Sequence, residues 1–233
     1  MKLTVLASTH FEELPDSVKD TEFGTFHRGK PFNSAERVSH FAGRACYQSW
    51  HMPSENTSTD MGYIANIIKQ GHFSVLEHGS VSFYVEGVSR ALLAELTRHR
   101  HLSFSVVSQR YVDYSDTRPV IPPAIAVEGG WALADLQTAY ANAIDIYNDL
   151  VETLTDSGLK RKQAREAARA VLPNAAPVDM VVTGNHRAWR DTLHKRYSTH
   201  ADAEILEFAT LVLTELRTMN PAIYQDFPDQ PFD

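Results

Sequence analysis

A short segment in the middle of the chain concentrates side chains that could bind a charged ligand. It carries three arginines, two histidines and several hydroxyl groups, in the order Arg98-His99-Arg100-His101-Leu102-Ser103-Phe104-Ser105-Val106-Val107-Ser108-Gln109-Arg110-Tyr111. Guanidinium groups form paired hydrogen bonds with phosphate or carboxylate groups, and the apolar side chains between them can hold a ring. The segment therefore predicts a pocket for an anionic, partly aromatic ligand such as a nucleotide.

The same arginines could also be ordinary surface charges paired with acidic groups. The chain of 233 residues has 29 acidic and 22 basic side chains and a net charge of −7. An acidic protein has no general attraction to nucleic acid or anionic membranes, so the arginines are interpreted as a local site. Two alternatives stay open: a nucleotide-binding regulator without catalysis, and a small-RNA binder that stacks bases on Phe104 and Tyr111.

The patterns around this segment predict the elements that hold it. Alternation from Val81 to Glu86 predicts a strand with one buried face, ended by Gly87. Ser89 is expected to cap the next helix, whose leucines lead directly into Arg98. The arginine segment is thus predicted to follow directly after a rigid helix.

The rest of the chain is predicted to be mostly helical. Strands are expected at residues 1–8 and 180–183, and loops at 16–33 and 53–59. Helices are expected at 34–47, with Val38, Phe41, Ala42 and Ala45 on the inner face, at 60–70 between Asp60 and Gly71, and at 131–157, 160–171, 185–196 with Asn185 as cap, and 201–219. The tail, 226–233, is expected to be loose. Without a repeat or linker, one α+β domain over 1–233 is predicted, with a small antiparallel or mixed sheet, several long helices and assembly into an oligomer.

The composition predicts a soluble, cytoplasmic protein. Its apolar fraction of 43% can fill a core, and no apolar run is long enough for a signal peptide or a bilayer span. The single cysteine, Cys46, can form no internal disulfide, which agrees with a reducing compartment. Cys46 is expected to be a buried structural thiol, because it lies on the predicted inner face of its helix.

Two other motifs carry less weight. Residues 24–30 have the glycine and lysine spacing of a phosphate-binding loop, but Pro31 stands where a hydroxyl must reach magnesium. His72, Glu77 and His78 come close to a helical zinc motif but are out of register, so a zinc hydrolase is a weaker alternative and no metal is expected.

The arginine segment resembles the R-H-R-x-x-S-x-x-x-x-S-x-R motif of the flavin-dependent thymidylate synthases, the ThyX family. The resemblance runs from about residue 35 to 224. It continues in the stretches His72-Phe73-Ser74, Glu77-His78, Glu95 with Arg98, Arg169, Asn185-His186-Arg187 and Arg196. It implies dUMP as substrate, dTMP as product, FAD as cofactor, NADPH as reductant and methylenetetrahydrofolate as one-carbon donor. It also implies a homotetramer with active sites shared between subunits.

The resemblance carries residue roles with it. Those implied to bind dUMP are Glu95, Arg98, Val106, Ser108, Gln109, Arg110, Arg169 and Arg196. Those implied to bind FAD are His72, Ser74, Arg98, His99, Arg100, Asn185, His186, Arg187 and Asp191. Arg196 is the candidate catalytic residue, because a guanidinium can stabilise negative charge at N3 and O2 of an activated uracil.

Two positions depart from the family pattern. Val106 stands where the family commonly has Glu or Gln, and Asp191 where it commonly has Asn or His. Ser108 is expected to donate or accept hydrogen bonds rather than attack the substrate, because no base is evident to activate it. Hydride transfer from a flavin would also remove the need for a cysteine nucleophile, so no catalytic role is expected for Cys46.

Overall fold

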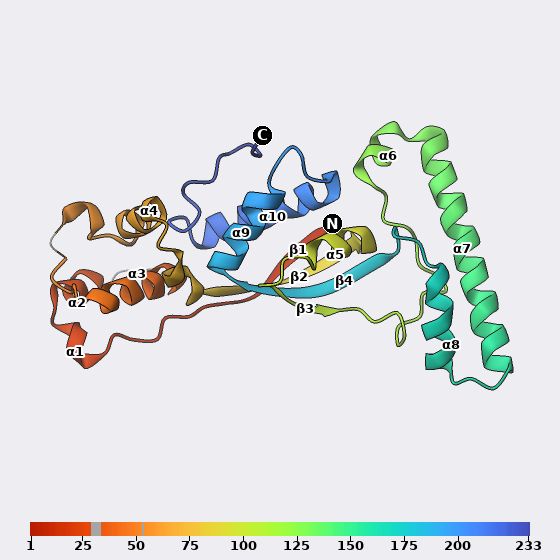
Figure 1. The fold of residues 1–233 in the computed structure, drawn as a ribbon, viewed down its shortest axis with the longest axis horizontal. Coiled ribbons are helices and arrows are strands. Elements are labelled where there is room, and N and C mark those ends of the chain that lie inside the picture. The colour runs from red at the N-terminus through yellow and green to blue at the C-terminus, as the bar shows by residue number, and fades with distance from the viewer. Residues whose placement is uncertain (29–33, 53) are drawn as a thin grey trace.

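The computed structural model describes residues 1–28, 34–52 and 54–233, and shows an elongated α+β fold (Figure 1). Its described elements, with η marking 3-10 turns, are β1 (Lys2–Ser8), α1 (Asp16–Lys19), α2 (Glu22–His27), α3 (Ser34–Tyr47), η1 (Glu55–Thr57), α4 (Asp60–Gln70), η2 (Phe73–Glu77), β2 (Ser80–Ser89), α5 (Arg90–Leu96), β3 (Ser103–Val106), α6 (Pro123–Glu128), α7 (Gly130–Asp156), α8 (Arg161–Ala168), η3 (Arg169–Val171), β4 (Pro177–Asn185), α9 (His186–Arg196) and α10 (Ala203–Met219). The α+β class is confirmed.

An antiparallel sheet forms the centre of the molecule, with strands in the order β1-β2-β4-β3. The two inner strands are longer than predicted: β2 continues past Gly87, and β4 covers nine residues. Gly87 has a φ of +70°, where the pairing between β2 and β4 shifts. Glycine adopts this left-handed conformation at little cost, so it bends the strand without ending it.

The helices α5, α9 and α10 cover one face of this sheet (Figure 1). Phe83, Met180 and Val182 point into the core from the strands, and Trp189 meets them from α9; all four are at most 1% exposed. Because α5 and α9 pack on the same sheet face, the segment that follows α5 is held close to α9.

Two groups of helices extend from the two ends of the sheet (Figure 1). The group α1 to α4 lies at one end, and α6, α7 and α8 lie at the other around a second cluster of buried tyrosines, Tyr114, Tyr140 and Tyr147. Within the described residues, no helix combines the length and the apolar character that crossing a bilayer requires.

Several predicted boundaries and burial assignments are wrong. The expected loop at 16–33 contains α1 and α2, while residues 29–33 and Pro53 lie outside the described residues. The short helix α6 was not predicted. The sequence also suggested Asp60 as the cap of α4, but Thr59 is the cap, through a hydrogen bond from the Gly62 amide to its hydroxyl.

The inner face of α3 is also more polar than predicted. Its fully buried side includes Ser39, His40 and Arg44, whereas Val38 and Phe41 are half-buried. Polar side chains are tolerated there because they are hydrogen-bonded: Arg44 donates to His40 Nε2 at 3.1 Å and to the Thr57 carbonyl at 2.5 Å.

Candidate active site

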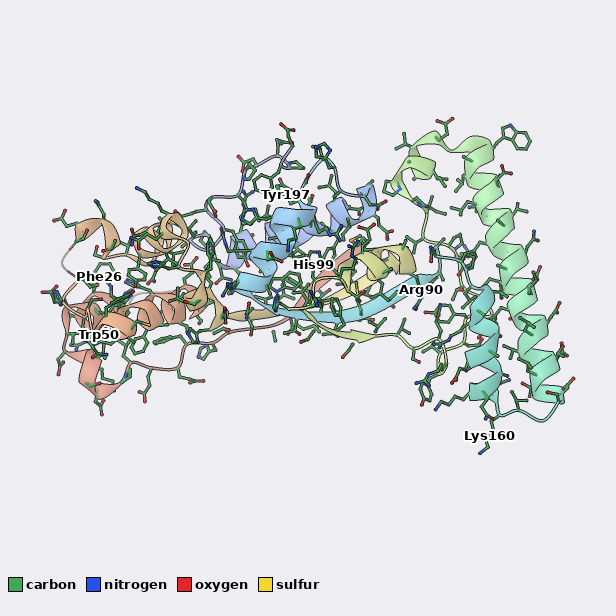
Figure 2. The ribbon with its side chains drawn as sticks, in the orientation of Figure 1. Phe26, Trp50, Arg90, His99, Lys160 and Tyr197 are labelled. Carbon is green, nitrogen blue, oxygen red and sulfur yellow. The ribbon has the colours of Figure 1, made fainter. Side chains whose placement is uncertain are left out.

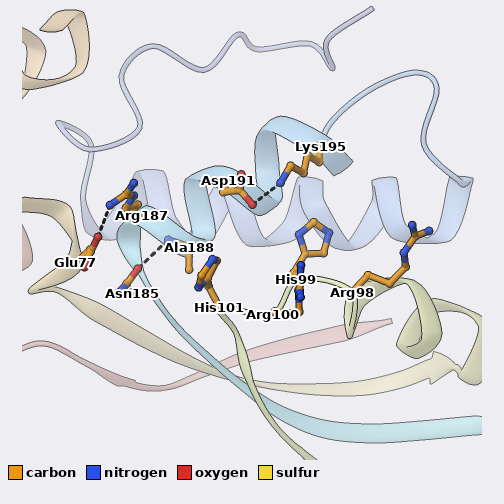
Figure 3. Close-up of a pocket in the computed structure, with 10 residues that line it drawn as sticks. All are labelled: Glu77, Arg98, His99, Arg100, His101, Asn185, Arg187, Ala188, Asp191 and Lys195. Carbon is orange, nitrogen blue, oxygen red and sulfur yellow. Dashed lines mark hydrogen bonds and ion pairs between the residues drawn. The ribbon is translucent and has the colours of Figure 1, made fainter. Parts of the chain in front are cut away.

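A cleft of about 540 Å³ lies between the segment that follows α5 and the helix α9 (Figure 3). The residues that line it are Glu77, Arg98, His99, Arg100, His101, Asn185, Arg187, Ala188, Asp191 and Lys195. This volume falls in the range of small-molecule and cofactor sites. The cleft therefore brings the first half of the arginine segment together with a region almost ninety positions later.

Local capping places both walls of this cleft. The Ser89 hydroxyl accepts a hydrogen bond from the Leu92 amide at 3.0 Å, which starts α5 as predicted. The Asn185 side chain accepts from the Ala188 amide at 2.8 Å, which starts α9 as predicted. Each cap satisfies an amide that the first helical turn leaves without a partner, so each helix begins at a fixed residue.

The charge of the cleft is mainly positive. Its two carboxylates are already paired, Glu77 with Arg187 at 2.5 Å and Asp191 with Lys195 at 2.7 Å. Among the described residues, no carboxylate pairs with the exposed guanidinium groups of Arg98 and Arg100. Together with the amino end of α9, these two cations make the cleft suitable for an anion.

Arg196, at the end of α9, is held in a network beside the cleft. Its Nη1 donates to Glu95 Oε2 at 2.8 Å, its Nη2 to the Glu95 carbonyl at 3.3 Å, and its Nε to His99 Nε2 at 3.0 Å. Burial of His99, reinforced by the positive charge of Arg196, lowers the His99 pKa. His99 therefore stays neutral near pH 7 and can accept the hydrogen bond, which fixes the guanidinium.

The second half of the arginine segment lies away from the cleft, alongside α8. Arg110 pairs with Glu166 of α8 at 3.4 Å, and Arg169 is exposed where η3 begins. The Ser108 hydroxyl accepts a long hydrogen bond of 3.4 Å from the Arg110 amide, and Gln109 is buried. Figure 2 shows the separation, with His99 at the centre of the molecule and Lys160, just before α8, at one end.

A second cleft, of about 360 Å³, adjoins the first and shares Arg187 with it. His72 and Ser74 line this second cleft, and so does Cys46. The prediction that Cys46 is buried is wrong: it is exposed, because α3 turns its polar side inward. Within a single chain, His72 and Ser74 therefore lie next to the larger cleft and not inside it.

Comparison with known proteins identifies the family. Residues 31–222 match the family described as thymidylate synthase complementing protein. The chain belongs to the family of flavin-dependent thymidylate synthases. It is 48% identical over 226 residues to the probable flavin-dependent thymidylate synthase of Mycobacterium phage L5, covering 95% of this chain and 89% of that protein. It is 43% identical over 238 residues to the flavin-dependent thymidylate synthase of Mycobacterium tuberculosis H37Rv, covering 97% and 90%.

A solved structure shares the fold of this synthase. It is thymidylate synthase X from Helicobacter pylori, described with FAD and dUMP, and it superposes with a TM-score of 0.67 at 20% identity over 97% of this chain and 98% of that one. The family match confirms the resemblance read from the arginine motif, and it favours an enzyme over the regulator and RNA-binding alternatives.

His186 does not present its side chain to either cleft of the synthase. The ring is fully buried and shares a hydrogen bond of 2.8 Å between Nδ1 and the Tyr224 hydroxyl. Burial lowers the pKa of His186 to about 4. A contact between this side chain and a ligand in the cleft is therefore excluded by its position.

His101 and Lys195 line the cleft but were not predicted. Lys195 could have been found from its spacing, because Arg187, Asp191 and Lys195 recur every four residues and so share one face of α9. His101 lies inside the arginine motif but at a position that the family pattern leaves undefined.

One cluster of metal-ligand types lies elsewhere in the described residues. His27, His40 and Asp60 bring their ligand atoms within 4.8 Å of one another, whereas His72, Glu77 and His78 form no such group. Arg44 donates to His40 Nε2, so the proton of this neutral ring lies on Nδ1, which donates to Asp60 at 2.8 Å. This pattern favours a proton rather than a metal ion between His40 and Asp60.

Proposed function

We propose that this synthase converts dUMP to dTMP with FAD as its cofactor, NADPH as reductant and methylenetetrahydrofolate as one-carbon donor. The observation that carries the proposal is the pair of exposed guanidiniums, Arg98 and Arg100, that line the cleft along α9 without carboxylate partners among the described residues. The names of the relatives, and the FAD and dUMP described with the Helicobacter pylori structure, support it.

The residues present fit FAD. The larger cleft offers donors to an anionic ligand along its length: Arg98 and Arg100 line one part of it, and the amino end of α9 lies at the other part, beside Asn185 and Arg187. The adjoining cleft offers room for a further part of the same ligand. When bound, the flavin supplies the hydride that reduces the transferred carbon. The residues assigned to it are His72, Ser74, Arg98, His99, Arg100, Asn185, Arg187 and Asp191, whereas the side chain of His186 is not assigned.

Asp191 departs from the family pattern without making the cleft anionic. Its carboxylate is paired with Lys195 at 2.7 Å, within the same helix. The pair leaves no uncompensated negative charge beside a phosphate or a reduced ring. Lys195 therefore compensates for the departure at Asp191.

Arg196 is the residue that we assign to activation of the uracil. Glu95 and His99 hold its guanidinium in one orientation through three hydrogen bonds. A preoriented cation stabilises negative charge at N3 and O2 of the ring without having to reorganise during the reaction. Glu95 and His99 thus position Arg196, whereas Arg98 is assigned to binding phosphate.

The remaining dUMP residues support a shared active site. Val106, Ser108, Gln109, Arg110 and Arg169 lie toward α8, away from the cleft that holds Arg98. We propose that the enzyme is a homotetramer in which this second group completes the cleft of another subunit. Val106 can contribute only its main chain, because it carries no polar side-chain atom.

The purified protein tests the proposal directly. Oxidised flavin bands should be visible, anaerobic NADPH should bleach them, and addition of dUMP with methylenetetrahydrofolate should then yield dTMP. Arg100→Ala should lose flavin during purification, whereas Arg28→Ala, which changes an exposed arginine just after α2, should retain it. A colourless protein that neither takes up added FAD nor forms dTMP would refute the proposal.

Ser108 has its own test. In the part of the chain that the structure describes, no general base hydrogen-bonds its hydroxyl, so Ser108→Ala should bind dUMP more weakly but still form dTMP. Complete loss of turnover with unchanged dUMP binding would make Ser108 a nucleophile instead.

A further inference from the structure

The end of the chain folds back onto α9, contrary to the prediction of a loose tail. Phe227 is 4% exposed, and the Phe232 amide donates to the Tyr197 carbonyl at 3.0 Å while its own carbonyl accepts from the Thr199 amide at 2.8 Å. The Tyr197 hydroxyl donates to the Asp229 carbonyl at 2.9 Å. The tail therefore follows the end of α9 closely (Figure 1).

A partly buried ion pair anchors this tail, because the Asp226 side chain stays 33% exposed while that of Arg190 is buried. Arg190 of α9, 3% exposed, donates Nη1 to Asp226 Oδ1 and Nη2 to Asp226 Oδ2, each at 2.7 Å. Its guanidinium also lies 5.0 Å from the Phe227 ring and 5.5 Å from the Phe73 ring. Burial would raise the pKa of Asp226, but the hydrogen bonds and charge of Arg190 lower it overall. The pair is therefore ionised at neutral pH.

His194, one helical turn after Arg190, makes a second contact with the tail. Its ring packs on the Phe227 ring at 4.5 Å and on the Phe232 ring at 5.4 Å, with interplanar angles of 30° and 29°. Burial lowers the pKa of His194, and the nearby Arg190 charge adds to this effect. The neutral ring of His194 therefore adds aromatic packing between α9 and the tail.

The tail contacts and the cleft residues occupy adjacent faces of the same helix. Arg187 and Asp191 line the cleft, and they also border a cavity of about 230 Å³ together with Phe73, Arg190 and His194. Phe73 begins η2, the segment of His72 and Ser74. Arg190 thus joins the tail to both segments that carry proposed flavin contacts.

We propose that Asp226, with Phe227 and Phe232, forms a C-terminal clamp that holds α9 in the orientation in which Arg187 faces the cleft. Asp226 is then a positioning residue for flavin binding, acting through Arg190. This inference rests on the proposed function for its ligand. The clamp lies beyond residues 31–222, the part of the chain that matches the family, so it is a feature that the family match does not cover.

The test compares Asp226→Asn with Asp229→Asn in the full-length protein. Asp229 is a matched control, because it lies in the same tail but its side chain is 97% exposed and pairs only with Arg217 at 3.4 Å. Amide hydrogen exchange of residues 186–196 measures how firmly the clamp holds α9. FAD titration and the flavin absorption spectrum, at a temperature where both variants are folded, measure the effect of the clamp on flavin binding.

Asp226→Asn should accelerate exchange in residues 186–196 and weaken FAD binding by about tenfold, since small displacements of binding groups are costly. Asp229→Asn should match the wild type in both measurements. Asp226→Glu, which keeps the carboxylate, should recover part of the affinity. If Asp226→Asn does not fold, Phe232→Ala removes one ring from the His194 contact and carries the same expectations.

Two outcomes overturn the clamp: unchanged exchange in α9, or faster exchange with unchanged FAD affinity and spectrum. Failure of the proposed function gives a different result, because the wild-type protein itself would then take up no flavin. In that case the exchange measurement still decides whether Asp226 holds α9.

Discussion

Acidification should destabilise this protein through His186. The ring is fully buried, and burial lowers its pKa to about 4 in the folded state, against about 6.5 in an unfolded chain. The unfolded state therefore binds a proton as the pH falls through 6.5, while the folded state does so only near pH 4. His186 contributes stability above pH 6.5, and this contribution falls by about 2 kcal/mol at pH 5 and about 3 kcal/mol below pH 4.

The assay is urea unfolding between pH 7.5 and 4.5 for the wild type and His186→Gln, at one protein concentration because assembly would add to stability. Gln can still hydrogen-bond the Tyr224 hydroxyl but does not titrate. The pKa values of His40, His99 and His194 are lowered as well, so both proteins should lose stability in acid. The wild type should lose about 2 kcal/mol more than the variant between pH 7 and pH 5. Equal slopes would refute the reasoning.

Three further substitutions test the structure. Cys46→Ser should leave dTMP formation unchanged, because the thiol is exposed beside the clefts and has no step to perform; loss of turnover in a steady-state assay would implicate sulfur. Gly87→Ala should lower the free energy of unfolding by about 1 kcal/mol, because φ is +70° there. Gly184→Ala should cost about 2 kcal/mol, because its Cβ would lie 2.4 Å from Leu102 Cδ2 and 3.1 Å from Trp189 Nε1. Thermal unfolding that leaves either glycine variant as stable as the wild type would contradict these packing arguments.

The sequence determined the features that depend on near neighbours. Ser89 and Asn185 were predicted as caps because a cap bonds an amide only three residues away. The alternation of β2 and the helical spacing of α10 come from which residues face the core, and both periods are visible in a single segment. The spacing of the arginine motif identified the family for the same reason.

Only the tertiary structure decided which distant groups meet. The tail is ordered because Asp226 pairs with Arg190, 36 positions earlier, and the polar face of α3 is buried because partners such as the Ala222 amide, which donates to Glu36, arrive from 186 positions away. Likewise, packing on one sheet face places Arg98 and Asn185 in the lining of one cleft and leaves Arg110 beside α8. A local sequence pattern indicates whether a side chain prefers to be buried or exposed to water. The partner that makes burial of a charged side chain favourable comes from a distant part of the chain, so the pattern does not show it.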